Sequence, residues 1–236
     1  QDIPMKASTH SGLNFAPWRL SGTVYGTLLN DPAALAAIGE AANHAPYKAA
    51  PRSPVLYVKP RNTLAGHGSH IAVPTGTPAL EIGASLGIVI GRATCRVRAQ
   101  DAFSHIAGWT LVADLSVPHD SFYRPSVRLK ALDGSCLLGP RVVQASQVPD
   151  PDALTLVVST SGNGVHTFST GGMQRGVAQL LQDVSAFMTL SAGDVLMLGV
   201  KFGAPQAKAG DSFSVDCAPI GMLQGQLVSE TVEVAA

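Results

Sequence analysis

Two cationic side chains stand at the end of a predicted strand, just before a glycine-rich turn. Lys59 and Arg61 occupy positions i and i+2 of YVKPRNTLAGHGSH. Side chains two residues apart in a strand share a face, so this pair would suit an anionic substrate, with arginine binding through its planar fork. A solvated strand edge is the alternative. His67 and His70 add an HxxH spacing, but in a turn rather than on a helix, which makes it a weak metal motif.

An acidic residue interrupts an apolar strand further along the chain. Asp114 lies in the middle of LVADLSV. A carboxylate in such a strand is unfavourable unless it is paired, hydrogen-bonded or bound to a metal ion, and perturbed acids gather at functional sites. Asp114 is therefore a candidate catalytic residue and a weak candidate metal ligand. A hydrogen-bonded structural aspartate is the alternative.

A second group of cations follows that strand. The segment FYRPSVRLKALDG places Tyr123, Arg124, Arg128 and Lys130 around a proline-directed turn. Arg128 and Lys130 again alternate, as they would on one face of a strand. Lys201 follows an apolar strand in LGVKFG, between glycines that allow close approach to a ligand. Converging cations would bind a dianion, whereas on a loop they would equally face solvent.

The first half of the predicted strand ALEIGASLGIVIG has few side chains that could take part in a reaction. Glu81, Gly83 and Ser85 fall on one face by the two-residue period of a strand, and apolar residues fall on the other. Other catalytic motifs are absent: the sequence has no GxSxG elbow, no GxGxxG after a strand and no Walker loop. In SVPHDSF, His119 stands too close to its serine and aspartate neighbours for a triad to align.

The elements that must position these residues are mostly strands. Strands are expected at 21–30, 55–60, 70–79, 86–91, 110–117, 152–163, 165–170, 191–200 and 210–223, with another near the C-terminus. Regular helices do not separate them. The pattern predicts an α+β, mostly β, mixed domain over residues 21–236, preceded by a loose segment over residues 1–20.

Three segments have helical patterns. Residues 31–45 begin with Asp31 as the N-cap and Pro32 at the first helical position. Residues 99–109 suit a short helix that would place Ala102, Ile106 and Trp109 on one face. Residues 173–190 form the clearest amphipathic helix, whose apolar side comprises Val177, Leu180, Leu181, Val184 and Phe187.

Composition limits the class of protein. The 236 residues are 46% hydrophobic and 14% charged, with a formal net charge of zero, which fits a well-buried globular protein and not a nucleic-acid or anionic-membrane binder. No apolar run is long enough for a membrane span, and the first residues lack a signal-peptide core. The three cysteines, Cys95, Cys136 and Cys217, are far apart and are expected to be reduced, buried thiols in the cytoplasm.

These segments, in this order, resemble the fumarylacetoacetate hydrolase family. The similarity covers about residues 20–232. It is carried by YVKPRNTLAGHG, LGIVIG, AFSHIAGWTLVADLSV, RLKALDGSCLLGP, LTLVVSTSGN, SAFMTLSAGDVLMLG and AGDSFSV. PYKAAP, KPRNT, SFYRPSVRLKALDG and LLGP are similar to one branch, the isomerase/decarboxylases of 4-hydroxyphenylacetate (homoprotocatechuate) degradation, and within it to the N-terminal half or the equivalent separate subunit.

The resemblance implies a mixed β-sandwich roll of the family's C-terminal domain type, and a chemistry. Such enzymes act on short oxo-acids through enolates stabilised by Mg²⁺ or Mn²⁺. In this branch the reactions are isomerisation of 2-hydroxyhepta-2,4-diene-1,7-dioate and decarboxylation of 5-oxopent-3-ene-1,2,5-tricarboxylate. The family's metal ligands are a Glu-x-Glu pair, which falls here on Gly83 and Ser85, and an aspartate, which survives as Asp114. The family's His-Glu base pair is also missing, because alanines of DPAALAAIGEA occupy the matching positions.

What remains by this resemblance is a set of groups for an anionic oxo-dicarboxylate. Its catalytic members are Lys130, Lys59 and Asp114, and its substrate-binding members are Arg61, Tyr123, Arg124 and Lys201. Three hypotheses follow: a catalytic subunit with no bound cofactor, a degenerate scaffold that pairs with a metal-bearing paralogue, or a metal-dependent hydrolase with Glu81 and Asp114 as ligands. A homodimer or a heteromer with a paralogous subunit is the expected assembly.

Overall fold

The computed structural model describes residues 22–123 and 126–230. Two sheets form the fold. The larger has eight strands in the order β2-β1-β10-β5-β6-β7-β3, with β11 paired to β5. Its strands are β1 (Val24–Leu28), β2 (Val55–Lys59), β3 (Leu64–Ala65), β5 (Leu80–Ile90), β6 (Ile106–Ser116), β7 (Cys136–Gln144), β10 (Val195–Met197) and β11 (Gln206–Ala207). Because β1 pairs parallel to β10 and β3 parallel to β7 while the other pairs are antiparallel, the sheet is mixed.

The smaller sheet has five strands in the order β4-β13-β12-β8-β9. They are β4 (Ser69–Val73), β8 (Thr155–Thr160), β9 (Gly164–Ser169), β12 (Ser212–Cys217) and β13 (Gly221–Ser229). Strands β8 and β9 form the predicted hairpin, with Thr155 opposite Ser169 and Thr160 opposite Gly164. The sheets contact each other where β6 and β7 meet β12 and β13, which makes the fold a sandwich.

The two faces of β5 confirm the predicted alternation. Ile82, Leu86 and Ile88 are fully buried in the main core, which the second sheet completes with residues such as Val215 and Leu223. Burying each side chain of this size stabilises the fold by about 1.5–3 kcal/mol. The opposite face carries the row Glu81, Gly83 and Ser85. The main core therefore lies on one side of β5. On the other side, Val89 packs into a second buried cluster with Val112 and Val195, and only Glu81, at the start of the strand, is partly exposed.

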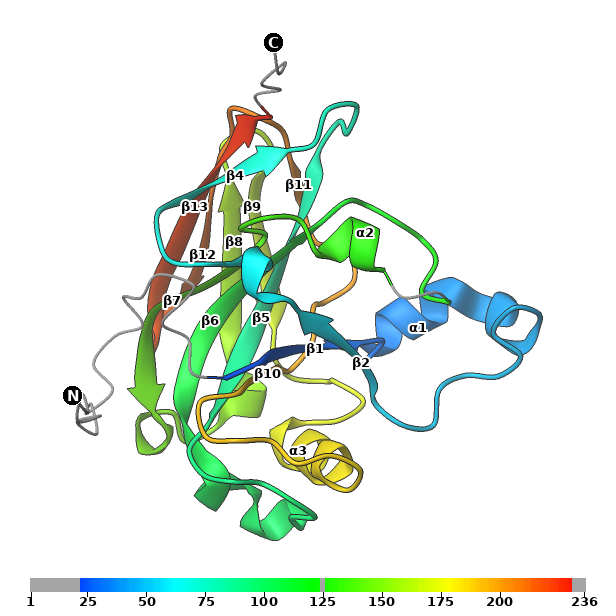
Figure 1. Cartoon of the computed structure of the whole chain (residues 1–236), viewed down its shortest axis with the longest axis vertical. Helices are drawn as coiled ribbons and strands as arrows, with labels where there is room; N and C mark the ends of the chain where they lie inside the picture. The colour runs from blue at the N-terminus through cyan, green and yellow to red at the C-terminus, as the bar shows by residue number, and fades with distance from the viewer. Residues whose placement is uncertain (1–21, 124–125, 231–236) are drawn as a thin grey trace, which may run out of the picture.

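Helices are few and short. They are α1 (Pro32–Ile38), α2 (Val127–Lys130) and α3 (Val177–Ser185), with 3-10 turns η2 (Gly39–Asn43), η3 (Arg61–Thr63), η4 (Ala99–His105), η5 (Ala145–Gln147) and η6 (Pro151–Ala153). In Figure 1, α1 follows the end of β1 on the right of the view, beside the start of β2, α2 lies above α1, and α3 lies below β10. The protein is thus mostly β, as the sequence predicts. The predicted loose segment, residues 1–20, lies outside the described residues.

Three helix predictions need correction. Ile106 and Trp109 belong to β6 rather than to a helix, because η4 ends at His105 and the long apolar run continues as a strand. Phe187 lies beyond the end of α3 and is 63% exposed, although the other predicted apolar residues of this helix are buried. Asp31 does stand at the N-cap of α1, but its side chain caps nothing there. Its carboxylate instead accepts a hydrogen bond from the Phe202 amide at 2.8 Å.

All three cysteines are free thiols, as expected, but only Cys136 and Cys217 are buried. Cys95 is exposed, contrary to the prediction, because it follows β5 in a surface turn. Burial raises the pKa of Cys136 to about 12, so its thiol stays protonated at neutral pH. Within the described ranges, none of the helices has the length and apolar character that crossing a membrane requires.

Candidate active site

Asp114 lies at the centre of a buried cluster of ionised and hydroxyl groups. The Lys59 ammonium is 2.9 Å from Asp114 Oδ1, and the Lys130 ammonium is 2.9 Å from Oδ2. The Tyr57 hydroxyl donates a hydrogen bond to the same Oδ2. Asp114 and Lys59 are almost fully buried, while Lys130 retains 8% of its surface. The sequence-based expectation that Asp114 must be paired is therefore confirmed.

Lys59 is the structural member of the cluster. The Lys59 ammonium forms an ion pair with Asp114 Oδ1, but the angles of this contact are not those of a hydrogen bond. Its aligned hydrogen bonds go to the backbone carbonyl of Lys130 and, at 3.2 Å, to the Ser135 hydroxyl. Lys59 therefore ties β2 to the end of α2 and fixes the position of Lys130. Lys130 also lies 4.9 Å from the centre of the Tyr57 ring, a cation–π contact.

Local sequence explains how these groups meet. Tyr57 and Lys59 are two residues apart in β2, so both point to the face of the sheet that carries Asp114. A Cβ at Gly26 would lie 2.0 Å from the Tyr57 ring, so glycine at this position of β1 makes room for the ring. The chain leaves β6, forms a loop and then forms helix α2, which contacts β6. The last residue of α2, Lys130, therefore lies on the face of the sheet that carries Asp114.

The charges of the cluster shift its pKa values. Burial alone would raise the pKa of Asp114, but Lys130, Lys59 and the Tyr57 hydrogen bond together outweigh burial and hold this pKa well below its usual range. Burial, and then the Asp114 charge, raise the pKa of Tyr57 well above its usual value. At neutral pH the cluster is therefore a carboxylate held by two ammonium groups and a neutral phenol.

A cavity of about 240 Å³ opens beside this cluster. Its walls include Tyr57, Glu81, His119, Lys130 and Lys201. Glu81 makes no ion pair with any described residue, and burial raises the pKa of its carboxyl against the opposing charges of Lys130 and His119. The cavity thus brings together two cations, an imidazole and a carboxyl group from four separate parts of the chain.

Lys201 joins the cavity as predicted, but its ammonium already has partners. It donates to the Gly171 carbonyl at 2.8 Å and forms an ion pair with Asp31 at 3.4 Å. Tyr123 lies outside this cavity. It lines an adjacent apolar cavity of about 520 Å³, which shares Tyr57 and Lys130 with the first.

The other predicted cations do not reach the cavity. Arg61 is exposed in η3, because the strand ends at Lys59, so the expected shared face of Lys59 and Arg61 does not form. Arg128 is exposed while Lys130 is buried, because both lie in a helix, where residues two apart point in different directions. Arg124 lies outside the described residues. The predicted metal motif also fails to form, since His67 accepts a backbone hydrogen bond from Gln224 and His70 is exposed.

Sequence reasoning missed two residues of the site. Tyr57 is the central residue of a short alternating strand, and only its two-residue spacing from Lys59 links it to the cluster. His119 was considered only as a member of a triad with its neighbours. Its position directly after a strand that carries a buried aspartate is the signal that could have identified it.

The residues present do not fit a divalent metal ion. Gly83 lies directly opposite Asp114, and a Cβ there would be 2.7 Å from the Asp114 carbonyl oxygen, so this backbone has no room for a glutamate. The Ser85 hydroxyl is fully buried and hydrogen-bonded to the Gly199 amide at 3.1 Å. Residues 22–123 and 126–230 contain no group of three or more potential metal-ligating side chains. The metal role considered for Asp114, with or without Glu81, is therefore unsupported by its contacts.

We expect Mg²⁺ and Mn²⁺ to bind this chain only weakly, because both oxygens of Asp114 already face ammonium groups. Isothermal titration of the purified chain with either ion should show no saturable one-site heat at micromolar concentrations. One-site binding that disappears in an Asp114→Ala variant would contradict this expectation. An Asp183→Ala variant, which removes a partner of Arg175 far along the chain, provides the control.

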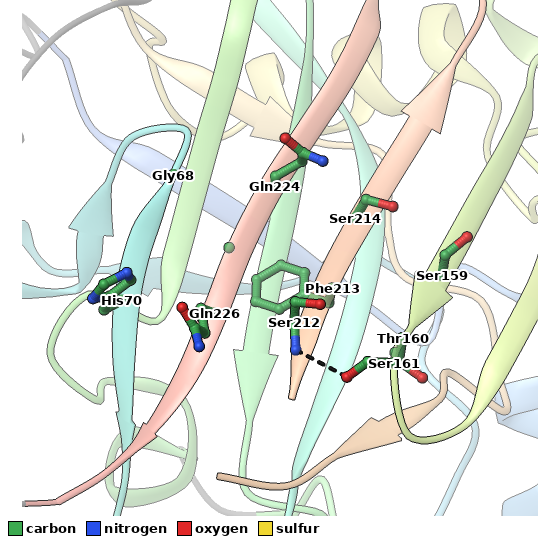
Figure 2. Close-up of a pocket in the computed structure, with 11 residues that line it drawn as sticks. Gly68, His70, Ser159, Thr160, Ser161, Ser212, Phe213, Ser214, Gln224 and Gln226 are labelled. Atoms are coloured by element: carbon green, nitrogen blue, oxygen red, sulfur yellow. Dashed lines mark hydrogen bonds between the residues drawn. The ribbon is translucent and has the colours of Figure 1, made fainter. Parts of the chain in front are cut away.

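A second hollow, of about 460 Å³, lies on the five-stranded sheet (Figure 2). Its short polar side chains come from β4, β8, β12 and β13, and the Ser212 amide donates to the Ser161 hydroxyl at 3.1 Å. Among the described residues that line it, none is an acid, a lysine or an arginine. Among its described lining residues the titratable side chain is His70, which has no lysine, arginine or acid beside it in the hollow, so the cavity beside Asp114 is the better candidate.

Comparison with known proteins identifies the family of this chain. The family profile described as "Fumarylacetoacetate (FAA) hydrolase C-terminal" matches residues 23–228. The 4-hydroxyphenylacetate degradation bifunctional isomerase/decarboxylase of Escherichia coli is 36% identical over 211 residues, which cover 89% of this chain and 48% of that protein. The chain thus spans about half the length of the curated relatives it matches.

Solved structures show the same architecture. The 5-carboxymethyl-2-hydroxymuconate delta-isomerase from Mycobacterium smegmatis superposes with a TM-score of 0.74 at 28% identity, covering 90% of this chain and 80% of that one. The 2-hydroxyhepta-2,4-diene-1,7-dioate isomerase from Mycobacterium marinum gives a TM-score of 0.72 at 26% identity, covering 89% and 76%. With a profile match over most of its length and these two folds, the chain belongs to the fumarylacetoacetate hydrolase family.

Proposed function

We propose that this chain is a subunit of an isomerase/decarboxylase in 4-hydroxyphenylacetate degradation. Its substrates would be 2-hydroxyhepta-2,4-diene-1,7-dioate and 5-oxopent-3-ene-1,2,5-tricarboxylate. The similarity to bifunctional enzymes of that route and to a dienedioate isomerase supports this proposal. The observation that carries it is the Lys130 ammonium, fixed by Asp114 and Lys59, at the wall of a cavity of substrate size.

Both reactions pass through a dienolate, so both need a positive charge beside an oxygen that becomes negative. Lys130 supplies such a charge without having to reorganise, because Asp114 and the Tyr57 ring hold it in place. Lys201 adds a second positive charge at the same cavity for a carboxylate of the substrate. Among the described residues that line the cavity, none is a cysteine or a serine, which agrees with proton-transfer and decarboxylation chemistry, since neither requires a strong nucleophile.

A scaffold role is the second candidate, and one observation favours it. Gly83 and Ser85 stand where the family resemblance places two metal-binding glutamates. In this alternative the chain orders the active site of a paralogous subunit that retains the pair, and its own cavity does not turn over substrate.

A reconstitution assay separates the two candidates. The purified chain is incubated with the dienedioate and with the tricarboxylate, alone and after mixing with a paralogue that carries the Glu-x-Glu pair. Turnover by the chain alone supports the catalytic proposal. Turnover that requires the paralogue, and that persists when Lys130 of this chain is replaced by methionine, supports the scaffold role. No turnover of either compound in any mixture overturns both.

A further inference from the structure

We propose that His119 is the proton-transfer residue of the cavity beside Asp114, and that it acts through Nε2. The inference rests on the proposed function, in which a dienol substrate occupies this cavity. His119 lies in the segment after β6 and lines the cavity together with Lys130 and Glu81. None of the comparisons assigns a role to this residue.

Hydrogen bonding fixes which nitrogen of His119 carries the proton. Nδ1 lies 2.8 Å from the backbone carbonyl of Val117, and since a carbonyl only accepts, Nδ1 must be the donor. In the neutral ring, Nε2 therefore carries the free lone pair. The ring also packs against Phe122, with centroids 5.6 Å apart, which limits its rotation. The local backbone thus holds the imidazole in its basic tautomer.

Nε2 is a buried atom with no partner. It is shielded from solvent, yet it makes no hydrogen bond with any residue in the described part of the chain. An unsatisfied buried nitrogen is unfavourable by about 1–3 kcal/mol and is uncommon in native structures. His119 lines the cavity, and the proposal places a ligand hydroxyl there as the partner of Nε2. The unpaired nitrogen is the observation that points to a ligand.

The hydroxyl and ammonium groups of the cavity are less suited to take a proton. The Tyr57 hydroxyl already donates to Asp114, and the Lys130 and Lys201 ammonium groups are held in ion pairs. Glu81 remains as the facing carboxyl, and Asp120 also lines the cavity. Glu81 lies near enough to His119 for their charges to interact, so a carboxylate there would stabilise the imidazolium once it forms.

His119 by itself can both take and return the proton that moves in the isomerisation. Nε2 of neutral His119 takes the proton of the dienol hydroxyl, so that the O–H bond breaks and an N–H bond forms. The dienolate charge is then stabilised beside Lys130. The imidazolium returns the proton to a carbon of the dienolate, the N–H bond breaks and a C–H bond forms. The product is the oxo compound, His119 is neutral again, and no other reactant is needed.

The test compares two variants of His119 with a control histidine. In His119→Asn the side-chain amide can still donate to the Val117 carbonyl, and His119→Gln offers a longer amide. Neither amide accepts and returns a proton at neutral pH. His105→Gln is the matched control, because His105 hydrogen-bonds in η4 and does not line the cavity. All proteins are first compared by circular dichroism and thermal unfolding.

We expect both His119 variants to lower kcat for the dienedioate by about 10²–10⁴-fold with little change in KM. The pH dependence of kcat/KM that a general base produces should disappear in both variants and persist in His105→Gln. Added imidazole should restore part of the rate to His119→Asn. If the wild-type protein turns over the dienedioate and both folded variants keep its rate and pH profile, the inference is overturned while the proposed function stands. No turnover by the wild type overturns the proposed function itself.

Discussion

Replacing Asp114 by asparagine is expected to lower the free energy of unfolding by about 3–5 kcal/mol. The substitution leaves Lys59 with no anionic partner at a position where its side chain has no exposed surface. Removing one member of a buried ion pair leaves an uncompensated charge, and this is among the largest effects that a single substitution produces. Urea denaturation of both proteins, followed by circular dichroism at neutral pH, measures the difference.

The same pair of proteins should respond differently to acid. The Asp114 pKa is lower in the folded protein than in the unfolded chain, so this carboxylate stabilises the fold above its unfolded pKa of about 3.9. That contribution is lost as the pH falls through the folded pKa. The gap between wild type and Asp114→Asn should therefore narrow below about pH 4.

Asp101→Asn is the control for the stability prediction. It removes an ion pair with Arg98 of similar length, 2.8 Å, but the two side chains are 72% and 44% exposed. Exposed pairs contribute little to stability, so this variant should unfold close to the wild-type midpoint. An Asp114→Asn variant that matches Asp101→Asn would show that the buried cluster does not stabilise the fold.

Replacing Lys130 by methionine is expected to lower kcat/KM for the dienedioate by about 10²–10³-fold in the active assembly. Methionine has a similar length but supplies no charge to the developing enolate oxygen, and removing one such preorganised group has an effect of this size. Steady-state kinetics on the folded variant gives the ratio. Binding of a saturated seven-carbon dicarboxylate should weaken as well, because Lys130 lines the cavity.

Arg128→Met provides the matched control for this substitution. It removes a cation from the same short helix, at an exposed position that does not line the cavity. Its kinetics should equal those of the wild type within a factor of about two, because substitutions at exposed positions away from the site change the energetics little. Equal activities of Lys130→Met and Arg128→Met would rule out Lys130 as the charge that stabilises the dienolate.

The spacing of apolar residues along the sequence predicted the main parts of this fold. Alternation in LGIVIG identified the buried strand, and the row of Glu81, Gly83 and Ser85 lies on its non-core face as expected. The hairpin of β8 and β9 followed from two alternating runs around a turn. Local rules of this kind succeed where burial and chain geometry agree. At residues 99–109 they succeeded only in part, because residues 99–105 form a 3-10 helix whereas Ile106 and Trp109 belong to the start of β6.

The site was predicted only in part, because its geometry depends on long-range contacts. Lys59, Lys130 and Asp114 do meet, over separations that no local pattern specifies. Arg61 and Arg128 were grouped with them by a strand period, but the chain is helical at both positions, so their side chains turn away. Tyr57 could not be assigned from the sequence, since its approach to Asp114 depends on a glycine in a neighbouring strand.

The close approach of Gly83 to Asp114 constrains how this lineage can change. A new Cβ at position 83 would meet not only the Asp114 carbonyl at 2.7 Å but also the Val200 side chain at 2.9 Å. A single substitution that introduces an acidic side chain there therefore disrupts the strand. A cation site at this position would require several coordinated replacements, including one that frees Asp114 from its lysines. Selection acting one mutation at a time is thus expected to preserve the present arrangement.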